Sequence, residues 1–408
     1  MDDVPVGRSV AIFFYAGDFV DVLRRHAARE QQIYATHGEV AQLILNLRAA
    51  GAHVTIYSYV TAAAGDETPV EGVRVVSLGG TGVNKGLLKA AVASVEADTI
   101  IAHFAYPELL TAAIKSRKRV FAGLANSYNE RGLRQFLRRK RIAHILNNKR
   151  IRMITNHCVP ATEHLAQIGV DRHKLVPWDV PHRFRPDDYL PKDLATKGTY
   201  DVAFAGSVAE LKGVGDLIRA ISLLNRQGLH LNASFAGLGD IDGMQALADT
   251  LGVGNCVNFR GLIGNEEVFR MFRDADIVAV PSRTDYPEGF PLTMFEALAS
   301  RSPIVCTDHP MFRPVLFDGD NCAVFRSGKV DEFAEAIKRV LTSPALYRQL
   351  SDSATETWTS LQGPADWRTL ITTWVIEGEQ SHWLDDFKLR ARKTPGQWKR
   401  HFPFGTHR

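Results

Sequence analysis

The stretch "DIVAVPSRTDYPEGFPLTMFEALASRSPIV", residues 276–305, contains the repeating unit that decides the fold. Its first residues, 276–282, contain the apolar run 277–281 and read as a buried strand, and a second strand-like run, "PIVCT", occupies 303–307. Between them, Pro291 suits the first turn of a helix that contains Phe295 and Leu298. Strand, helix and strand in this order predict one βαβ unit of a parallel sheet.

The same alternation extends in both directions along the chain. Strand-like runs occur at 8–15, 53–60, 73–78, 98–104, 119–124, 200–207, 231–239, 257–261 and 322–325. Helical patterns occur at 37–51, 214–228, 244–252, 265–275 and 330–341. We therefore predict an α/β fold of two doubly wound, Rossmann-like domains facing a cleft, with ligands bound at the carboxyl ends of the strands.

The domain boundaries follow from a change in composition. Residues 177–198 are polar and contain four prolines, which indicates a linker, placed at 181–198. We expect an N-terminal domain at 1–180, a C-terminal domain at 199–362, and a C-terminal helix with a basic tail at 363–408. The helix is expected to return to the N-terminal domain.

Composition excludes several classes of protein. The four cysteines are far apart, so a zinc site or a disulfide framework is not expected; they are Cys158, Cys256, Cys306 and Cys322. The sequence contains no run of 18 apolar residues, so a membrane-spanning helix is not predicted. No leader pattern is visible at the N-terminus. We expect a cytoplasmic protein with reduced thiols.

Two carboxylates mark the loop and helix of the opening stretch. Glu288 lies in a turn beside Gly289, which permits close approach of the backbone to a ligand. The helix that starts near Pro291 directs free N–H groups and its positive dipole end toward this turn, which favours a phosphate. Glu296 lies among apolar residues, where an ionised carboxylate needs hydrogen-bond donors. Ligand hydroxyls would supply them; a nearby arginine or water is the alternative.

A second phosphate signal follows the strand at 200–207. Gly206 stands at the bend and Lys212 enters the next helix, so that backbone N–H groups and an ammonium could meet an anion. The motif is not a Walker loop, because GxxxxGK[ST] is absent. A surface lysine that caps a turn explains the same residues.

With these residues quoted, the sequence resembles the family-four retaining glycosyltransferases of GT-B fold. "EGFPLTMFEALASRSPIV" is similar to the family's E-x7-E signature. The segments "DVAFAGSVAELKGVGDLIRAI", "FAGLGD", "VNFRG", "FRDADIVAVPS" and "DGDNCAVF" occur in the family's order. The resemblance is close over residues 200–345 and looser in the first half, where "HGEVAQLILNLRAAGAHVTIYS" is similar to the family's glycine loop and first long helix.

The resemblance implies a role for each matching residue. Glu288 would hold the donor sugar, Lys212 would neutralise the diphosphate, and Glu296 would accept hydrogen bonds from the ribose. Glu288 and Lys212 are the implied catalytic residues. The remaining implied donor-binding residues are Gly38, Gly206, Ser207, Arg260, Gly261, Leu262, Gly289, Phe290, Pro291 and Leu292.

The chain departs from the family pattern at Ser207, at Leu211, where an acid is frequent before the lysine, and at the position of an acceptor-side histidine. Ser207 stands where the family usually has an arginine, so one diphosphate cation is missing or comes from elsewhere. Asn126 is the nearest candidate for the family's acceptor-side histidine, and His103 matches a separate position that often holds histidine. Ordinary strand-end roles explain both residues equally well.

The implied reaction is transfer of a hexose-type sugar from a UDP-, GDP- or ADP-linked donor to a hydroxyl acceptor, with retention of configuration. The family needs no metal or other cofactor, and no Asp-x-Asp motif follows a strand at the expected donor site. Implied acceptors are a cell-envelope glycan, a polysaccharide or a lipid-linked precursor. An inactive or binding-only homologue and a nucleotide-sugar epimerase remain the alternatives.

A basic segment in the N-terminal domain, on the acceptor side by resemblance, indicates a further partner. Residues 131–153 contain nine Lys/Arg and no acid, interleaved with apolar residues such as Phe136 and Leu137. An anionic membrane surface would suit this pattern, with the protein peripheral on the inner face. A solvated basic helix is the alternative, and nucleic acid is disfavoured.

Overall fold

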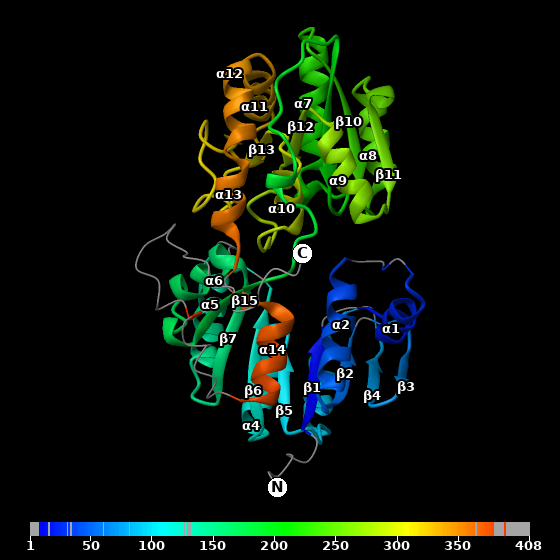
Figure 1. The fold of residues 1–408 in the computed structure, drawn as a ribbon, viewed down its shortest axis with the longest axis vertical. Coiled ribbons are helices and arrows are strands. Elements are labelled where there is room, and N and C mark those ends of the chain that lie inside the picture. The colour runs from blue at the N-terminus through cyan, green and yellow to red at the C-terminus, as the bar shows by residue number, and fades with distance from the viewer. Residues whose placement is uncertain are drawn as a thin grey trace. The chain divides into compact units, whose positions relative to one another are not determined.

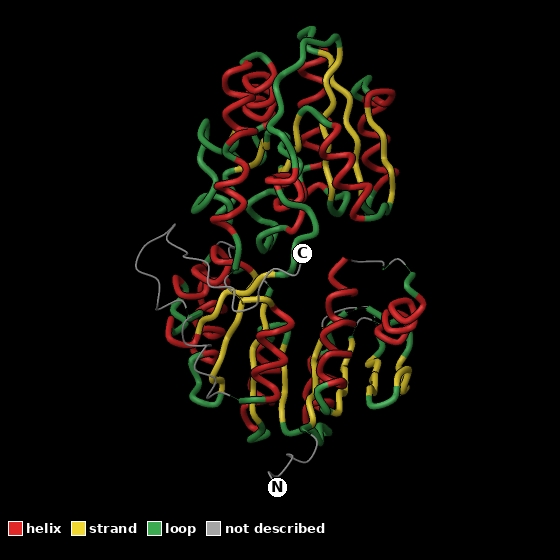
Figure 2. Tube along the Cα trace, in the orientation of Figure 1, coloured by secondary structure: helices red, strands yellow, loops and turns green. Residues whose placement is uncertain are grey.

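The computed structural model describes residues 8–14, 17–30, 32, 35–59, 61–80, 82–125, 127–128, 132–363, 365–378 and 387–388. The chain divides into two compact units. In its described part, unit 1 comprises the residues up to Pro181 together with those from Gly363 onward. Unit 2 comprises His182–Gln362. Strands alternate with helices in both units (Figure 1, Figure 2).

Unit 2 is built on a parallel sheet of six described strands in the order β11-β10-β9-β12-β13-β14. The strands are β9 (Thr199–Ala205), β10 (His230–Ala236), β11 (Val257–Gly261), β12 (Ile277–Val280), β13 (Ile304–Thr307) and β14 (Ala323–Phe325). The helices are α7 (Val214–Arg226), α8 (Ile241–Thr250), α9 (Asn265–Asp274), α10 (Leu292–Ala299), α11 (Val330–Leu341), α12 (Pro344–Asp352) and α13 (Ala354–Leu361). Helices α7 and α11 pack against each other, and α9 packs against β9.

The strand order of unit 2 places its switch point between β9 and β12. The chain runs outward from β9 through β10 to β11, then returns to β12 on the other side of β9 and continues to β14. Connections therefore leave the carboxyl ends of β9 and β12 in opposite directions. In open α/β sheets this is the place where ligands bind.

Unit 1 has a sheet of nine described strands in the order β15-β8-β7-β6-β5-β1-β2-β4-β3. The strands are β1 (Ser9–Phe14), β2 (His53–Ser58), β3 (Ala64–Val70), β4 (Val73–Leu78), β5 (Thr99–Ala102), β6 (Arg119–Leu124), β7 (Ile151–His157), β8 (Leu175–Asp179) and β15 (Ala365–Asp366). Only β3 pairs antiparallel among these. The helices are α1 (Phe19–Ala28), α2 (Ala35–Ala49), α3 (Lys85–Ala93), α4 (Pro107–Lys115), α5 (Leu133–Leu146), α6 (Cys158–Gln167) and α14 (Trp367–Ile376).

The C-terminal helix returns to unit 1, as the sequence predicts. Strand β15 pairs with β8, and α14 packs on α2. The apolar side of α14 is buried, with Trp374 inaccessible to solvent. Burial of the large side chains of Trp367 and Trp374 in the core of unit 1 stabilises the packing of α14 against much earlier residues of the chain.

The proline-rich segment differs from a simple linker. Its first part, 177–179, belongs to strand β8, which pairs with β7 although Pro177 has no backbone N–H to donate. Its later part packs on unit 2, where the carbonyl of Pro186 accepts from Arg301 Nε at 2.8 Å. The residues expected to be a linker, 181–198, therefore lie almost entirely within unit 2.

Candidate functional site

An ion pair occupies the switch point of unit 2. Lys212 lies in the short 3-10 turn Glu210–Lys212 after β9, and Glu288 lies in the loop after β12. The Lys212 ammonium is 2.5 Å from Glu288 Oε2, and the two side chains are 12% and 9% exposed. The structure thus brings together the two residues expected to meet the donor diphosphate and sugar.

Gly213 makes this close approach possible. Its φ of 77° lies in the left-handed region, and a Cβ atom built there would stand 2.1 Å from the carbonyl oxygen of Pro281. Any side chain would therefore separate the loop after β9 from the loop after β12. The glycine that follows Lys212 in the sequence is explained by packing rather than by contact with a phosphate.

Two further residues surround the ion pair. Ser282 donates its hydroxyl to Glu288 Oε2 at 2.8 Å. The ring of Tyr286 lies under Lys212, with the ammonium 4.4 Å from the ring centroid. The Ser282 hydroxyl thus holds the Glu288 carboxylate, and the Tyr286 ring holds the Lys212 ammonium.

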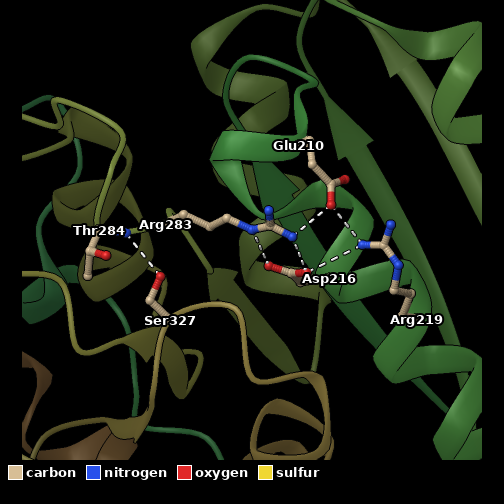
Figure 3. Close-up of polar contacts among 6 residues, drawn as sticks. All are labelled: Glu210, Asp216, Arg219, Arg283, Thr284 and Ser327. Carbon is tan, nitrogen blue, oxygen red and sulfur yellow. Dashed lines mark hydrogen bonds and ion pairs between the residues drawn. The ribbon is translucent and has the colours of Figure 1, made fainter.

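Arg283 ties the same two loops together through its charge (Figure 3). Its guanidinium donates to Asp216 Oδ2 at 2.9 Å and to Glu210 Oε1 at 2.7 Å, while its N–H donates to the carbonyl of Leu211. Hydrogen bonding to Asp216 raises the pKa of Arg283. Because the Arg283 guanidinium is already paired with both carboxylates, it does not supply the diphosphate cation expected at position 207. Ser207, which stands at that position, is exposed just after β9.

Helix α10 begins next to Glu288 with no side-chain cap at Pro291. No side-chain acceptor therefore competes with an anion for the first amides of α10, although the Met294 N–H donates to the Pro291 carbonyl at 3.0 Å. One turn further along, Glu296 is half-buried, and its carboxylate makes no hydrogen bond or ion pair with the described residues. Burial raises the pKa of Glu296 to about 7. A carboxylate without a protein donor at this position suits a ligand that brings hydroxyl groups.

The other donor-side candidates lie on neighbouring strands and loops of unit 2. Arg260, Gly261 and Leu262 stand at the carboxyl end of β11, with Arg260 and Leu262 exposed. The Gly261 carbonyl accepts from the Gly237 N–H at 2.8 Å. A Cβ at Gly237 would stand 1.8 Å from the carbonyl of Gly206, so the β9 and β10 strand ends touch through glycines.

The candidates in the loop after Glu288 differ in how far they are buried. Gly289 and Leu292 are half-buried, whereas the Phe290 ring is 2% exposed and lies 5.7 Å from the ring of Phe295. Phe290 therefore anchors the loop in the core, and only its backbone can face a ligand.

The unit 1 candidates fit the sequence expectation less well. Gly38 lies within helix α2 and not in a loop, and its contact with the donor phosphates stays a prediction. His103 follows β5 and stacks on Phe14 with ring centroids 4.2 Å apart, and burial lowers the pKa of His103 to about 4. This places the imidazole in aromatic packing. Asn126 lies outside the described residues.

Sequence reasoning missed the residues that hold the ion pair. Ser282, Tyr286 and Arg283 all lie inside the quoted opening stretch, yet nothing in their spacing marks them. The signal that could have found Arg283 is the pair of acids after β9, Glu210 in the short turn and Asp216 in the first turn of α7.

The comparison with protein families now decides the classification. Residues 187–357 match the model of "Glycosyl transferases group 1". Unit 2 is a group 1 glycosyltransferase domain. A curated relative is the D-inositol 3-phosphate glycosyltransferase of Streptomyces avermitilis, 28% identical over 220 residues, which are 50% of this chain and 47% of the relative. The chain thus spans about half the length of that relative.

Solved glycosyltransferase structures extend the likeness to both units. Sucrose-phosphate synthase from Thermosynechococcus elongatus has a TM-score of 0.61 at 17% identity, covering 91% of this chain and 98% of its own. Anabaena HepE in complex with UDP-glucose has a TM-score of 0.59 at 15% identity, covering 90% and 98%. These likenesses confirm the predicted GT-B class of fold. No described helix has the length and apolar character to cross a membrane.

Proposed function

We propose that the chain transfers a hexose-type sugar from a nucleoside-diphosphate sugar to a hydroxyl acceptor, with retention of configuration and without a metal ion. The observation that carries the proposal is the Lys212–Glu288 pair at the switch point of a group 1 glycosyltransferase domain. The uncapped start of α10 and the unpaired carboxylate of Glu296 lie on the same loop and helix.

The proposed roles follow from the charge that develops during transfer. The departing nucleoside diphosphate gains negative charge, which the Lys212 ammonium and the first amides of α10 would stabilise. Glu288 would accept hydrogen bonds from the sugar hydroxyls beside the reacting carbon. The leaving phosphate would take the acceptor proton on the same face of the sugar, so that Glu288 need not act as a nucleophile.

The donor is tested by nucleotide binding. UDP, GDP and ADP and their sugars are added singly in a thermal-shift assay, because a ligand that binds the folded state raises Tm by mass action. UDP is the first candidate, since the structurally similar HepE was solved in complex with UDP-glucose. A Glu296→Gln variant should lose most of the shift, whereas a variant of the exposed Glu356 should keep it.

The reaction is tested by product analysis. Release of nucleoside diphosphate is measured with and without EDTA, and the anomeric configuration of the product is read by NMR. Loss of turnover in EDTA contradicts the metal-free mechanism, and an inverted product contradicts retention. Tight nucleotide binding without turnover of any sugar would favour the inactive homologue, and interconversion of the sugar without transfer would favour the epimerase.

We propose a lipid-linked or cell-envelope acceptor met at an anionic membrane surface, which would place the chain in the cytoplasm on the inner face. Helix α5 supports this partner. Leu133, Phe136 and Leu137 are 75%, 46% and 59% exposed, while Ile142 and Leu146 are buried in unit 1. The exposed apolar side chains alternate with arginines and lysines, which suits the headgroup region of anionic lipids.

Liposome flotation tests this contact. Replacing Arg138 and Lys140 with Ser should reduce binding to vesicles that contain phosphatidylglycerol, and high salt should do the same. Replacing the exposed Lys329 and Lys338 of unit 2 with Ser removes the same charge and should leave binding unchanged. Equal losses in both variants, or no binding by the unmodified chain, would exclude α5 as the membrane contact.

A further inference from the structure

The carbonyl of Tyr286 is a junction within the loop that carries Glu288. It accepts the N–H of Glu288 at 2.7 Å, and His309 Nε2 lies 3.1 Å from the same oxygen. Tyr286 also places its ring under Lys212. Tyr286 thus connects His309, on the segment after β13, to Glu288 through its carbonyl and to Lys212 through its ring.

The hydrogen bonds of His309 define its protonation. The N–H of Met311 donates to His309 Nδ1 at 3.2 Å, so Nδ1 acts as an acceptor and carries no hydrogen. A neutral imidazole then has its hydrogen on Nε2, where it donates to Tyr286. The ring is inaccessible to solvent and lies 5.1 Å from the ring of Phe312.

The surroundings of His309 disfavour an imidazolium. Burial lowers the pKa of His309 most and the Lys212 ammonium lowers it further, whereas the hydrogen bond to Tyr286 and the charges of Glu288 and Asp308 raise it. The two hydrogen bonds already satisfy both ring nitrogens of the neutral form. A second ring proton would have to displace the Met311 N–H.

We propose that His309 is a positioning residue for sugar transfer: its Nε2–H fixes the Tyr286 carbonyl and so sets the Lys212 ammonium and the Glu288 carboxylate toward the donor. The proposal rests on the proposed function for its consequence in catalysis. The structural half, that His309 orders the loop 285–288, stands on the contacts alone.

Two substitutions separate the two hydrogen bonds of His309. Glutamine can place an amide N–H close to the position of Nε2 and keep the contact with Tyr286. Asparagine can place an acceptor close to Nδ1 for the Met311 N–H but is too short to reach Tyr286. Both remove the ring from the core, so a purely structural role predicts similar damage from His309→Gln and His309→Asn.

The first readout is steady-state kinetics of nucleoside diphosphate release. His309→Asn should lower kcat about tenfold or more, because small misplacement of a catalytic group is costly, while KM for the donor changes by less than about threefold. His309→Gln should recover most of kcat. His230→Asn, at an exposed histidine of the same unit, is the control and should match the unmodified chain.

The second readout is amide hydrogen exchange of a peptide that covers residues 284–290. Exchange should be faster in His309→Asn than in His309→Gln, with peptides of β9 and β12 unchanged in both. Equal exchange or equal kcat in the two variants would overturn the proposal. If no nucleotide sugar turns over, the proposed function fails, and the exchange comparison still decides whether His309 orders the loop.

Discussion

Substitution of Glu296 by glutamine should stabilise unit 2 at alkaline pH. The carboxylate is half-buried without a protein donor, and burial raises its pKa from 4.5 to about 7. At about 1.36 kcal/mol for each factor of ten, this corresponds to about 3 kcal/mol of destabilisation by the charged form. Since the side chain keeps some contact with water, we expect about 2 kcal/mol in measurement.

The pH dependence has a definite sign. A carboxyl group whose pKa is raised on folding favours the folded state at low pH, and this contribution is lost as pH rises through the folded pKa near 7. The charged form therefore costs most at pH 8. At pH 5 the folded carboxyl is protonated, and the advantage of glutamine should fall below about 1 kcal/mol.

Urea unfolding at pH 5 and pH 8 measures the effect. The midpoint for Glu296→Gln should exceed that of the unmodified chain at pH 8 and approach it at pH 5. Glu356→Gln, at an exposed carboxylate of α13, should show no difference at either pH. A Glu296→Gln variant that is less stable at pH 8 would refute the reasoning, because it would mean that the carboxylate has a stabilising partner.

Three further predictions concern the switch point. Lys212→Met and Glu288→Gln should each lower the free energy of unfolding of unit 2 by about 2 kcal/mol, and the double variant should lower it by less than the sum of the two. Additive losses of Tm in a double-mutant cycle would show that the pair is not coupled. Gly213→Ala should cost more than about 2 kcal/mol, since its Cβ would meet the Pro281 carbonyl; calorimetry with an unchanged Tm would exclude that clash. Arg283→Lys should keep the charge but lower turnover about tenfold, because an ammonium lacks the planar set of donors that meets both carboxylates; full activity would make the guanidinium geometry irrelevant.

Regular periodicity explains which elements were predictable from the sequence. Strands β4, β6 and β11 and helix α11 lie at the predicted residues, because their apolar positions follow a single period to a clear turn. Strand β3 was missed because it is a charged, exposed antiparallel edge. Strand β7 follows a basic helix without a turn signal, and β8 contains a proline at a position that reads as linker.

The site was predictable only in part. The residue types and spacing of Glu288, Glu296 and Lys212 pointed to one ligand site, and the strand order places Lys212 and Glu288 at its switch point. The direct pairing of Lys212 with Glu288 joins residues 76 positions apart, so it depends on strand order and on Gly213. His309 carries no local signal at all, because its role lies in a hydrogen bond to a backbone carbonyl.

The chain passes from unit 1 to unit 2 after Pro181 and back to unit 1 at Gly363. Asp179 Oδ2 accepts the N–H of Gly363 at 3.1 Å, and a Cβ at Gly363 would stand 2.6 Å from the carbonyl carbon of Trp178. The chain thus leaves unit 1 and re-enters it at nearly the same point, so residues 182–362 form an insertion with adjoining ends. Exchange of this segment for that of a relative would leave unchanged the distance that its ends must span, so the proposed donor site of unit 2 would be exchanged separately from unit 1.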